Sequence, residues 1–113
     1  MSYYIKAIIL ENCPYSNAAT KIINENKINN DMIIVTNINK QIYKTDKINT
    51  FPQIYLQKYN SNGSQLLGGY DDLKYSMDIF KNKKYDESNV NMFMNKYNWS
   101  KKATLRLIEL LNH

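Results

Sequence analysis

Cys13 is the residue with the clearest capacity for chemistry, and it is the single cysteine of the 113-residue chain. It is followed by Pro14, Tyr15 and Ser16, and it comes shortly after the apolar run 3–10. Proline suits the first position of a helix because it has no amide to pair there. A cysteine at such a helix start lies beside unpaired amides and the positive end of the helix dipole, which favour a thiolate. Since the thiolate is the attacking species in disulfide exchange, the pattern predicts a nucleophile.

A single cysteine leaves three roles open: a buried inert thiol, a reactive nucleophile, or a metal ligand shared between molecules. A disulfide within the chain would need a second cysteine. A structural zinc site would need several ligands, which Cys13 and the single histidine, His113, do not supply. The surroundings of Cys13 therefore have to decide between these roles.

The elements predicted around Cys13 are a strand, a helix and a second strand. The nearly continuous apolar run 3–10 is typical of a buried strand. Apolar residues at helical spacing predict a helix over 17–27, opened by the proline, and 32–36 is a short β-branched strand. These three elements form a βαβ unit, whose strands are expected to be parallel with a right-handed crossover.

The second half of the chain adds a hairpin and helices. A short helix is predicted first, and two strands joined by a turn follow it; a helix then starts at Tyr70, with acidic residues in its first turn. The predicted ranges are 40–46 for the short helix, 53–59 and 65–67 for the strands, 60–64 for the turn and 70–82 for the helix. The fold class is therefore α/β, with a mixed four-stranded sheet and C-terminal helices.

The stretch 83–99 is an insertion that the sequence does not place. Its apolar residues are expected to cover the edge of the core; they are Val90, Met92, Phe93, Met94 and Tyr97. Ser100 is a predicted N-cap for the last helix. That helix carries a broad apolar stripe formed by Leu105, Ile108 and Leu111, with Leu107 and Leu110. There is no internal repeat, and residues 1–113 are predicted to form one domain.

Composition and charge exclude several classes of function. The net charge is +5, but lysines spread along the chain supply nearly all of the positive charge, so a solvated basic surface is expected rather than a nucleic-acid interface. No apolar stretch has the length of a membrane span, and the first residues lack the order of a signal peptide. We therefore expect an intracellular, cytoplasmic protein in a reducing compartment, with no membrane partner.

Three segments carry a resemblance to a known family. Cys13-Pro14-Tyr15-Ser16 after a strand resembles the active-site motif of glutaredoxins, which belong to the thioredoxin-fold superfamily. Thr50-Phe51-Pro52 resembles the Thr-Val-Pro segment of that family, and Gly68-Gly69-Tyr70-Asp71-Asp72-Leu73 resembles its Gly-Gly-x-x-Asp-Leu segment. The three occur in the family's order, and they organise residues 3 to about 80.

The resemblance implies a thioredoxin-like fold, a cis bond before Pro52 and glutathione as co-substrate. It places the cysteinyl part of glutathione against the backbone of Phe51, a short β-type addition. The implied glutathione-binding residues are Tyr15, Lys47, Thr50, Phe51, Pro52, Gly69, Tyr70, Asp71 and Asp72.

The charged ends of glutathione have implied partners too. The amides of Tyr70 and Asp71 would hold the γ-glutamyl carboxylate at the helix start. Asp72, or Asp71 beside it, would hold the γ-glutamyl ammonium. A lysine, Lys44 or Lys47, would meet the glycyl carboxylate.

The chain departs from the family at two positions. Leu10 stands where many glutaredoxins carry a lysine, and the neighbouring Glu11 carboxylate disfavours a thiolate at Cys13. Ser16 stands where a dithiol glutaredoxin has its resolving cysteine, so only a monothiol mechanism is open to this chain.

These observations predict an enzyme, a glutathione-disulfide oxidoreductase that acts on glutathione mixed disulfides of protein thiols as a monomer, with no bound metal. An alternative is a homodimeric carrier in which Cys13 and glutathione from each subunit ligate a [2Fe-2S] cluster. A third reading is a binding protein with a degenerate site, in which 83–99 contacts a partner.

Overall fold

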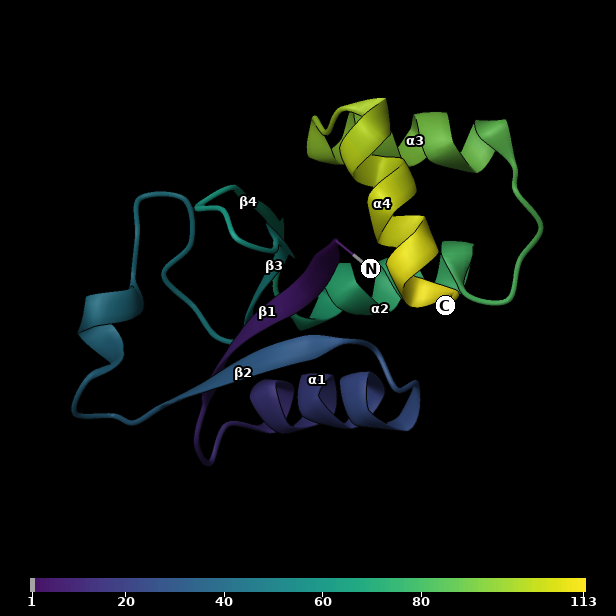
Figure 1. The fold of residues 1–113 in the computed structure, drawn as a ribbon. Helices are drawn as coiled ribbons and strands as arrows, with labels where there is room; N and C mark the ends of the chain where they lie inside the picture. Colours follow the sequence, from purple (N-terminus) through teal and green to yellow (C-terminus); the bar gives the residue numbers. More distant parts are fainter. Residues whose placement is uncertain (1) are drawn as a thin grey trace.

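The structure is a computed structural model that describes residues 2–113, and its elements follow the predicted order closely. Four strands, four α-helices and one 3-10 helix, η1, succeed one another along these residues (Figure 1). The elements are β1 (Tyr3–Leu10), α1 (Pro14–Glu25), β2 (Asn30–Val35), η1 (Lys40–Tyr43), β3 (Gln53–Lys58), β4 (Ser64–Gly68), α2 (Tyr70–Phe80), α3 (Glu87–Tyr97) and α4 (Lys101–Leu111).

The strands form one mixed sheet in the order β2-β1-β3-β4. β1 pairs parallel with β2, where Ile8 lies opposite Ile33, and antiparallel with β3, where Ala7 lies opposite Ile54. β3 and β4 form the predicted antiparallel hairpin. The prediction of an α/β fold with a mixed four-stranded sheet is therefore confirmed. The parallel pair brings the ends of β1 and β2 to one edge of the sheet, where the chain turns to Cys13.

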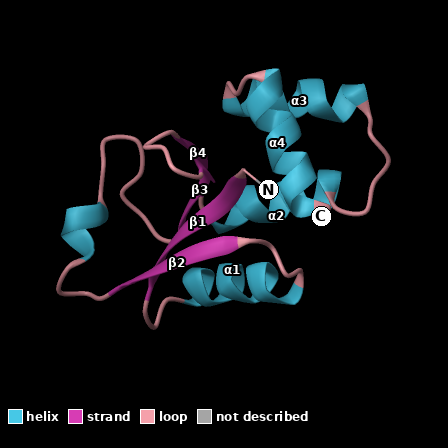
Figure 2. Ribbon diagram, in the orientation of Figure 1, coloured by secondary structure: helices cyan, strands magenta, loops and turns pink. Residues whose placement is uncertain are grey.

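The hydrophobic core lies between the sheet and the helices. Ile5 and Ala7 of β1 are completely buried, and so are Ile23 of α1, Leu73 of α2 and Leu107 of α4. Figure 1 shows α1 running beside β1 and β2. Figure 2 shows α3 and α4 grouped together, away from α1. No helix within residues 2–113 is both long and apolar enough to cross a membrane.

The unplaced stretch 83–99 proves to contain a helix that belongs to the core. Asp86 caps α3 by accepting a hydrogen bond from the Ser88 amide at 2.8 Å, and α3 ends at Asn98 in the left-handed conformation (φ 54°). Phe93 is completely buried and meets the ring of Trp99 edge-on, with 5.3 Å between centroids. The expectation that this stretch only covers the edge of the core was therefore wrong, because α3 inserts aromatic side chains into it.

Two further predictions need correction. The segment 40–46 forms only the single turn Lys40–Tyr43, after which Lys44 is extended. In α4 the buried face comprises Thr104, Leu107, Leu110 and Leu111, whereas Leu105 and Ile108 are only partly buried. Thr104 tolerates burial because its hydroxyl donates a hydrogen bond to the Ser100 carbonyl at 2.8 Å, so a threonine takes a place on the buried face that Leu105 was expected to take.

Candidate active site

Cys13 lies at the junction of β1 and α1, where it is the N-cap residue of the helix (φ −107°, ψ 121°). The turn that precedes it is made by Asn12, which adopts the left-handed conformation (φ 59°). Pro14 opens the helix, and the carbonyl of Cys13 accepts the first helical hydrogen bond from the Asn17 amide at 2.9 Å. The thiol is therefore held at the helix N-terminus while remaining partly accessible to solvent.

The electrostatics of this position favour a thiolate. Burial raises the pKa of Cys13, but hydrogen bonds from the Ser16 amide, the Ser16 hydroxyl and the Tyr15 amide lower it, and the net pKa is lowered. Glu11, which was expected to oppose the thiolate, is not among the groups that shift this pKa. The start of α1 thus stabilises the thiolate although Leu10 stands in place of a lysine.

Ser16, which stands in place of a second cysteine, has a structural role of its own. Its side chain is completely buried, and its hydroxyl oxygen accepts a hydrogen bond from the Leu10 amide at 3.0 Å. The same hydroxyl is one of the groups that lower the pKa of Cys13. Ser16 therefore links the last residue of β1 to the thiolate.

The segment before β3 faces Cys13 across the site. The Phe51–Pro52 peptide bond is cis, as the resemblance implied, and the Phe51 carbonyl oxygen lies 4.0 Å from the Sγ of Cys13. The completely buried Gln53 anchors this segment, because its amide donates to the Tyr43 carbonyl at 2.9 Å and accepts from the Tyr55 hydroxyl at 2.9 Å. Sequence reasoning assigned Gln53 only to a strand and missed this anchoring role.

A groove of about 480 Å³ opens beside Phe51 and α2. The predicted glutathione-binding residues all lie along it, whereas Lys44 does not. Tyr15, 62% exposed, and Tyr70 stand 6.1 Å apart between ring centroids within this groove. Its lining residues are Tyr15, Lys47, Ile48, Thr50, Phe51, Pro52, Leu66, Gly68, Gly69, Tyr70, Asp71 and Asp72.

The two aspartates at the start of α2 are placed differently. Asp71 is exposed, whereas Asp72 is half-buried and both of its carboxylate oxygens accept hydrogen bonds. Oδ2 accepts from the Gly69 amide and Oδ1 from the Tyr97 hydroxyl, each at 2.8 Å. Asp72 also packs closely on Gly68 (φ 138°), where an added Cβ would lie 2.1 Å from Oδ2. Sequence reasoning missed the contribution of Tyr97, which comes from the stretch it left unplaced.

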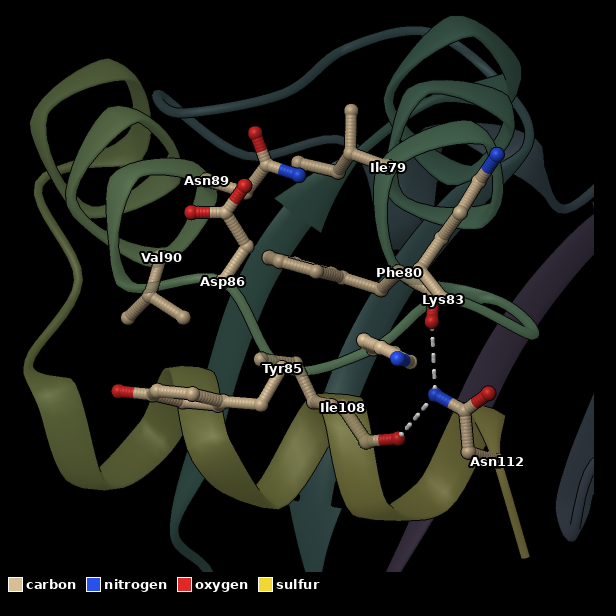
Figure 3. A pocket seen from close by; sticks show the side chains of 10 residues that line it. Ile79, Phe80, Lys83, Tyr85, Asp86, Asn89, Val90, Ile108 and Asn112 are labelled. Atoms are coloured by element: carbon tan, nitrogen blue, oxygen red, sulfur yellow. Dashed lines mark hydrogen bonds between the residues drawn. The ribbon is translucent and has the colours of Figure 1, made fainter.

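A second cavity, of about 180 Å³, lies between α2, α3 and α4. Figure 3 shows Phe80, Tyr85 and Ile108 around it, with the Asn112 side chain bonded to the Phe80 and Ile108 carbonyls. This cavity shares no lining residue with the groove beside Phe51, so we do not assign it to the same site.

The [2Fe-2S] carrier considered as an alternative depends on the metal ligands that the chain offers. Within residues 2–113, no three histidine, cysteine or acidic side chains are grouped so that they could hold a metal ion. One chain offers the thiol of Cys13 alone. A [2Fe-2S] cluster would therefore take its remaining ligands from a second chain and from glutathione.

Comparisons with known proteins bear on the fold. The sequence matches no protein-family model and no curated protein. Among solved structures it is similar to glutaredoxin 1 from Francisella tularensis, whose crystal structure was determined in complex with cacodylate. The likeness covers 68% of this chain and 94% of that one, with a TM-score of 0.51 and 24% sequence identity. At this identity the likeness shows the architecture, and the chain has the thioredoxin-like fold of that glutaredoxin.

Proposed function

We propose that this protein is a glutathione-dependent thiol–disulfide oxidoreductase, which reduces glutathione mixed disulfides through Cys13 alone. The observation that carries the proposal is the position of the Cys13 sulfur. It has a lowered pKa at the start of α1, and it lies 4.0 Å from the backbone of Phe51, which lines a groove of about 480 Å³. Disulfide exchange requires an accessible thiolate, and the neighbouring groove gives room for a substrate of peptide size.

The reaction proceeds by two exchanges. The Cys13 thiolate attacks the glutathione sulfur of the mixed disulfide, the bond between that sulfur and the substrate sulfur breaks, and the substrate leaves as a thiolate that takes up a proton. A second glutathione, as thiolate, then attacks the glutathione sulfur bound to Cys13. This step forms oxidised glutathione and returns the Cys13 thiolate, so glutathione supplies both electrons.

The groove offers a partner for each part of glutathione. We assign the cysteinyl part to the Phe51 backbone, at the end of the segment that begins at Thr50. The amides at the start of α2 suit the γ-glutamyl carboxylate, because they are unpaired donors at the positive end of the helix dipole. Asp72 suits the ammonium group, and Lys47, which lines the groove, suits the glycyl carboxylate.

The monothiol route follows from the residues near the sulfur. Ser16 occupies the position from which a second thiol would attack, so the chain has no means of closing an internal disulfide with Cys13. The bound glutathione must then be removed by a second glutathione. The proposed partners are accordingly glutathione and glutathionylated protein thiols in a reducing compartment, with the protein acting as a monomer.

The test is turnover of a small glutathione mixed disulfide, coupled to glutathione reductase, by the wild type and by Cys13→Ser. We expect turnover by the wild type and none by the variant. Turnover that survives in Cys13→Ser would overturn the proposal. An inactive wild type that takes up a [2Fe-2S] cluster on anaerobic reconstitution with glutathione, and dimerises as it does so, would favour the carrier instead.

A further inference from the structure

Tyr97, in α3, is bonded to a residue that lines the groove beside Phe51. Its hydroxyl donates a hydrogen bond to Oδ1 of Asp72 at 2.8 Å, although the two residues are 25 positions apart in the sequence. Asp72 lines the groove, and its other oxygen, Oδ2, accepts from the Gly69 amide at 2.8 Å. Two donors from two different elements therefore determine the orientation of one carboxylate.

The surroundings of Tyr97 hold its ring in place. The ring packs against Phe93, with 4.6 Å between centroids, and lies 6.1 Å from the ring of Tyr75. The Lys96 ammonium lies 5.8 Å from the centroid of the Tyr97 ring. Burial, together with Asp72 and Tyr75, raises the pKa of the Tyr97 hydroxyl far above its ordinary value. The hydroxyl therefore stays protonated at neutral pH and acts as a donor.

We infer that Tyr97 is a positioning residue for γ-glutamyl recognition: it holds the Asp72 carboxylate in the orientation that meets the ligand's ammonium group, which makes α3 a part of the glutathione site. This inference rests on the proposed function. It gives the stretch 83–99 a role beyond filling the core, since the Tyr97 hydroxyl bonds Asp72, which lines the groove.

The effect of Tyr97 on ligand binding follows from the number of hydrogen bonds that the Asp72 carboxylate accepts. Without the Tyr97 hydroxyl, Asp72 keeps only the bond from the Gly69 amide to Oδ2, and Oδ1 can move. Binding of the ligand then has to immobilise the Asp72 side chain. Ordering one such side chain costs about 0.5–1.5 kcal/mol, which corresponds to a weakening of binding of roughly two- to twelvefold.

The experiment measures equilibrium binding, so that it does not depend on turnover. Two unreactive probes are used, S-methylglutathione and S-methylcysteinylglycine, which lacks the γ-glutamyl group. Tyr97→Phe keeps the ring and removes only the hydroxyl. We expect it to weaken binding of S-methylglutathione roughly two- to twelvefold, with no change for S-methylcysteinylglycine. General loosening of the fold would instead weaken both probes equally.

Two further variants make the test specific. Tyr75→Phe removes a hydroxyl from the same aromatic cluster and should leave binding of both probes unchanged. Asp72→Asn should weaken S-methylglutathione binding, and adding Tyr97→Phe to it should weaken binding no further, because both substitutions act through one carboxylate.

Each outcome decides the inference. If the wild type prefers S-methylglutathione and Tyr97→Phe keeps the full preference, the inference is overturned while the proposed function stands. If the wild type shows no preference for S-methylglutathione, the inference and the proposed glutathione site are overturned together.

Discussion

Replacing Ser16 by alanine tests how the active-site loop is held together. The Ser16 hydroxyl is completely buried, and it accepts the Leu10 amide at 3.0 Å. Ser16→Ala would leave this amide without its partner at the end of β1. An unsatisfied buried donor costs about 1–3 kcal/mol, which is more than the net contribution of an ordinary hydrogen bond. In a domain of this size the melting temperature should fall by at least about 3 °C.

The same substitution changes the chemistry of Cys13. Because the Ser16 hydroxyl is one of the groups that lower the pKa of Cys13, its removal should raise that pKa toward the ordinary value of a thiol. The fraction of thiolate at pH 7 then falls, and so does the rate of alkylation by iodoacetamide at that pH. Loss of stability and loss of reactivity are thus expected from one hydroxyl group.

Ser76 supplies a matched control. It is a second completely buried serine, but its hydroxyl donates to the Asp72 carbonyl one turn earlier in α2, at 2.9 Å. Ser76→Ala leaves no amide unpaired, so its unfolding free energy should lie within about 0.5 kcal/mol of the wild type. The assays are urea denaturation and the pH dependence of alkylation. Equal stability of the two variants, or an unchanged alkylation midpoint in Ser16→Ala, would refute the reasoning.

Three further predictions concern Cys13 and the groove. The alkylation rate of wild-type Cys13 should rise with pH to a plateau, with its midpoint below the ordinary thiol value of 9.0, because the lowered pKa moves ionisation to lower pH. A midpoint at or above that value would contradict the lowered pKa. Gly68→Ala should cost at least about 1–3 kcal/mol in urea denaturation and displace Asp72, since φ is 138° and the new Cβ would lie 2.1 Å from Oδ2. Gly69→Ala meets only the Pro52 carbonyl oxygen, at 3.6 Å, and should cost about 1 kcal/mol through its poorer N-cap; equal losses in the two glycine variants would be inconsistent with this geometry. Lys47→Ala should raise the KM for a glutathione mixed disulfide several-fold while leaving kcat within twofold, and a fall in kcat alone would argue against a binding role.

The parts of the site that sequence reasoning anticipated depend on local rules. An apolar run followed by Cys13-Pro14 specifies a strand end and a helix start, because proline tolerates the first helical turn. The alternating residues of β3 and the turn before β4 specify the hairpin in the same way. Once the strand order is known, the segment that ends at Pro52 falls beside Cys13.

The parts that were missed depend on contacts between distant segments. The hydrogen bond from Tyr97 to Asp72 joins two helices, and no spacing within either helix indicates it. The helix α3 itself did have a pattern, since Val90, Phe93 and Tyr97 recur at helical spacing after the N-cap Asp86. The polar residues between them obscured its amphipathic character.

The central claim is that the Cys13 sulfur attacks the glutathione half of a mixed disulfide. The most direct measurement is the intact mass of the wild type after mixing with one equivalent of a mixed disulfide between glutathione and a peptide, with no free glutathione present. We expect a single adduct, a glutathionyl group on Cys13, with release of the reduced peptide. An adduct of the peptide on Cys13, or no adduct at all, would contradict the central claim.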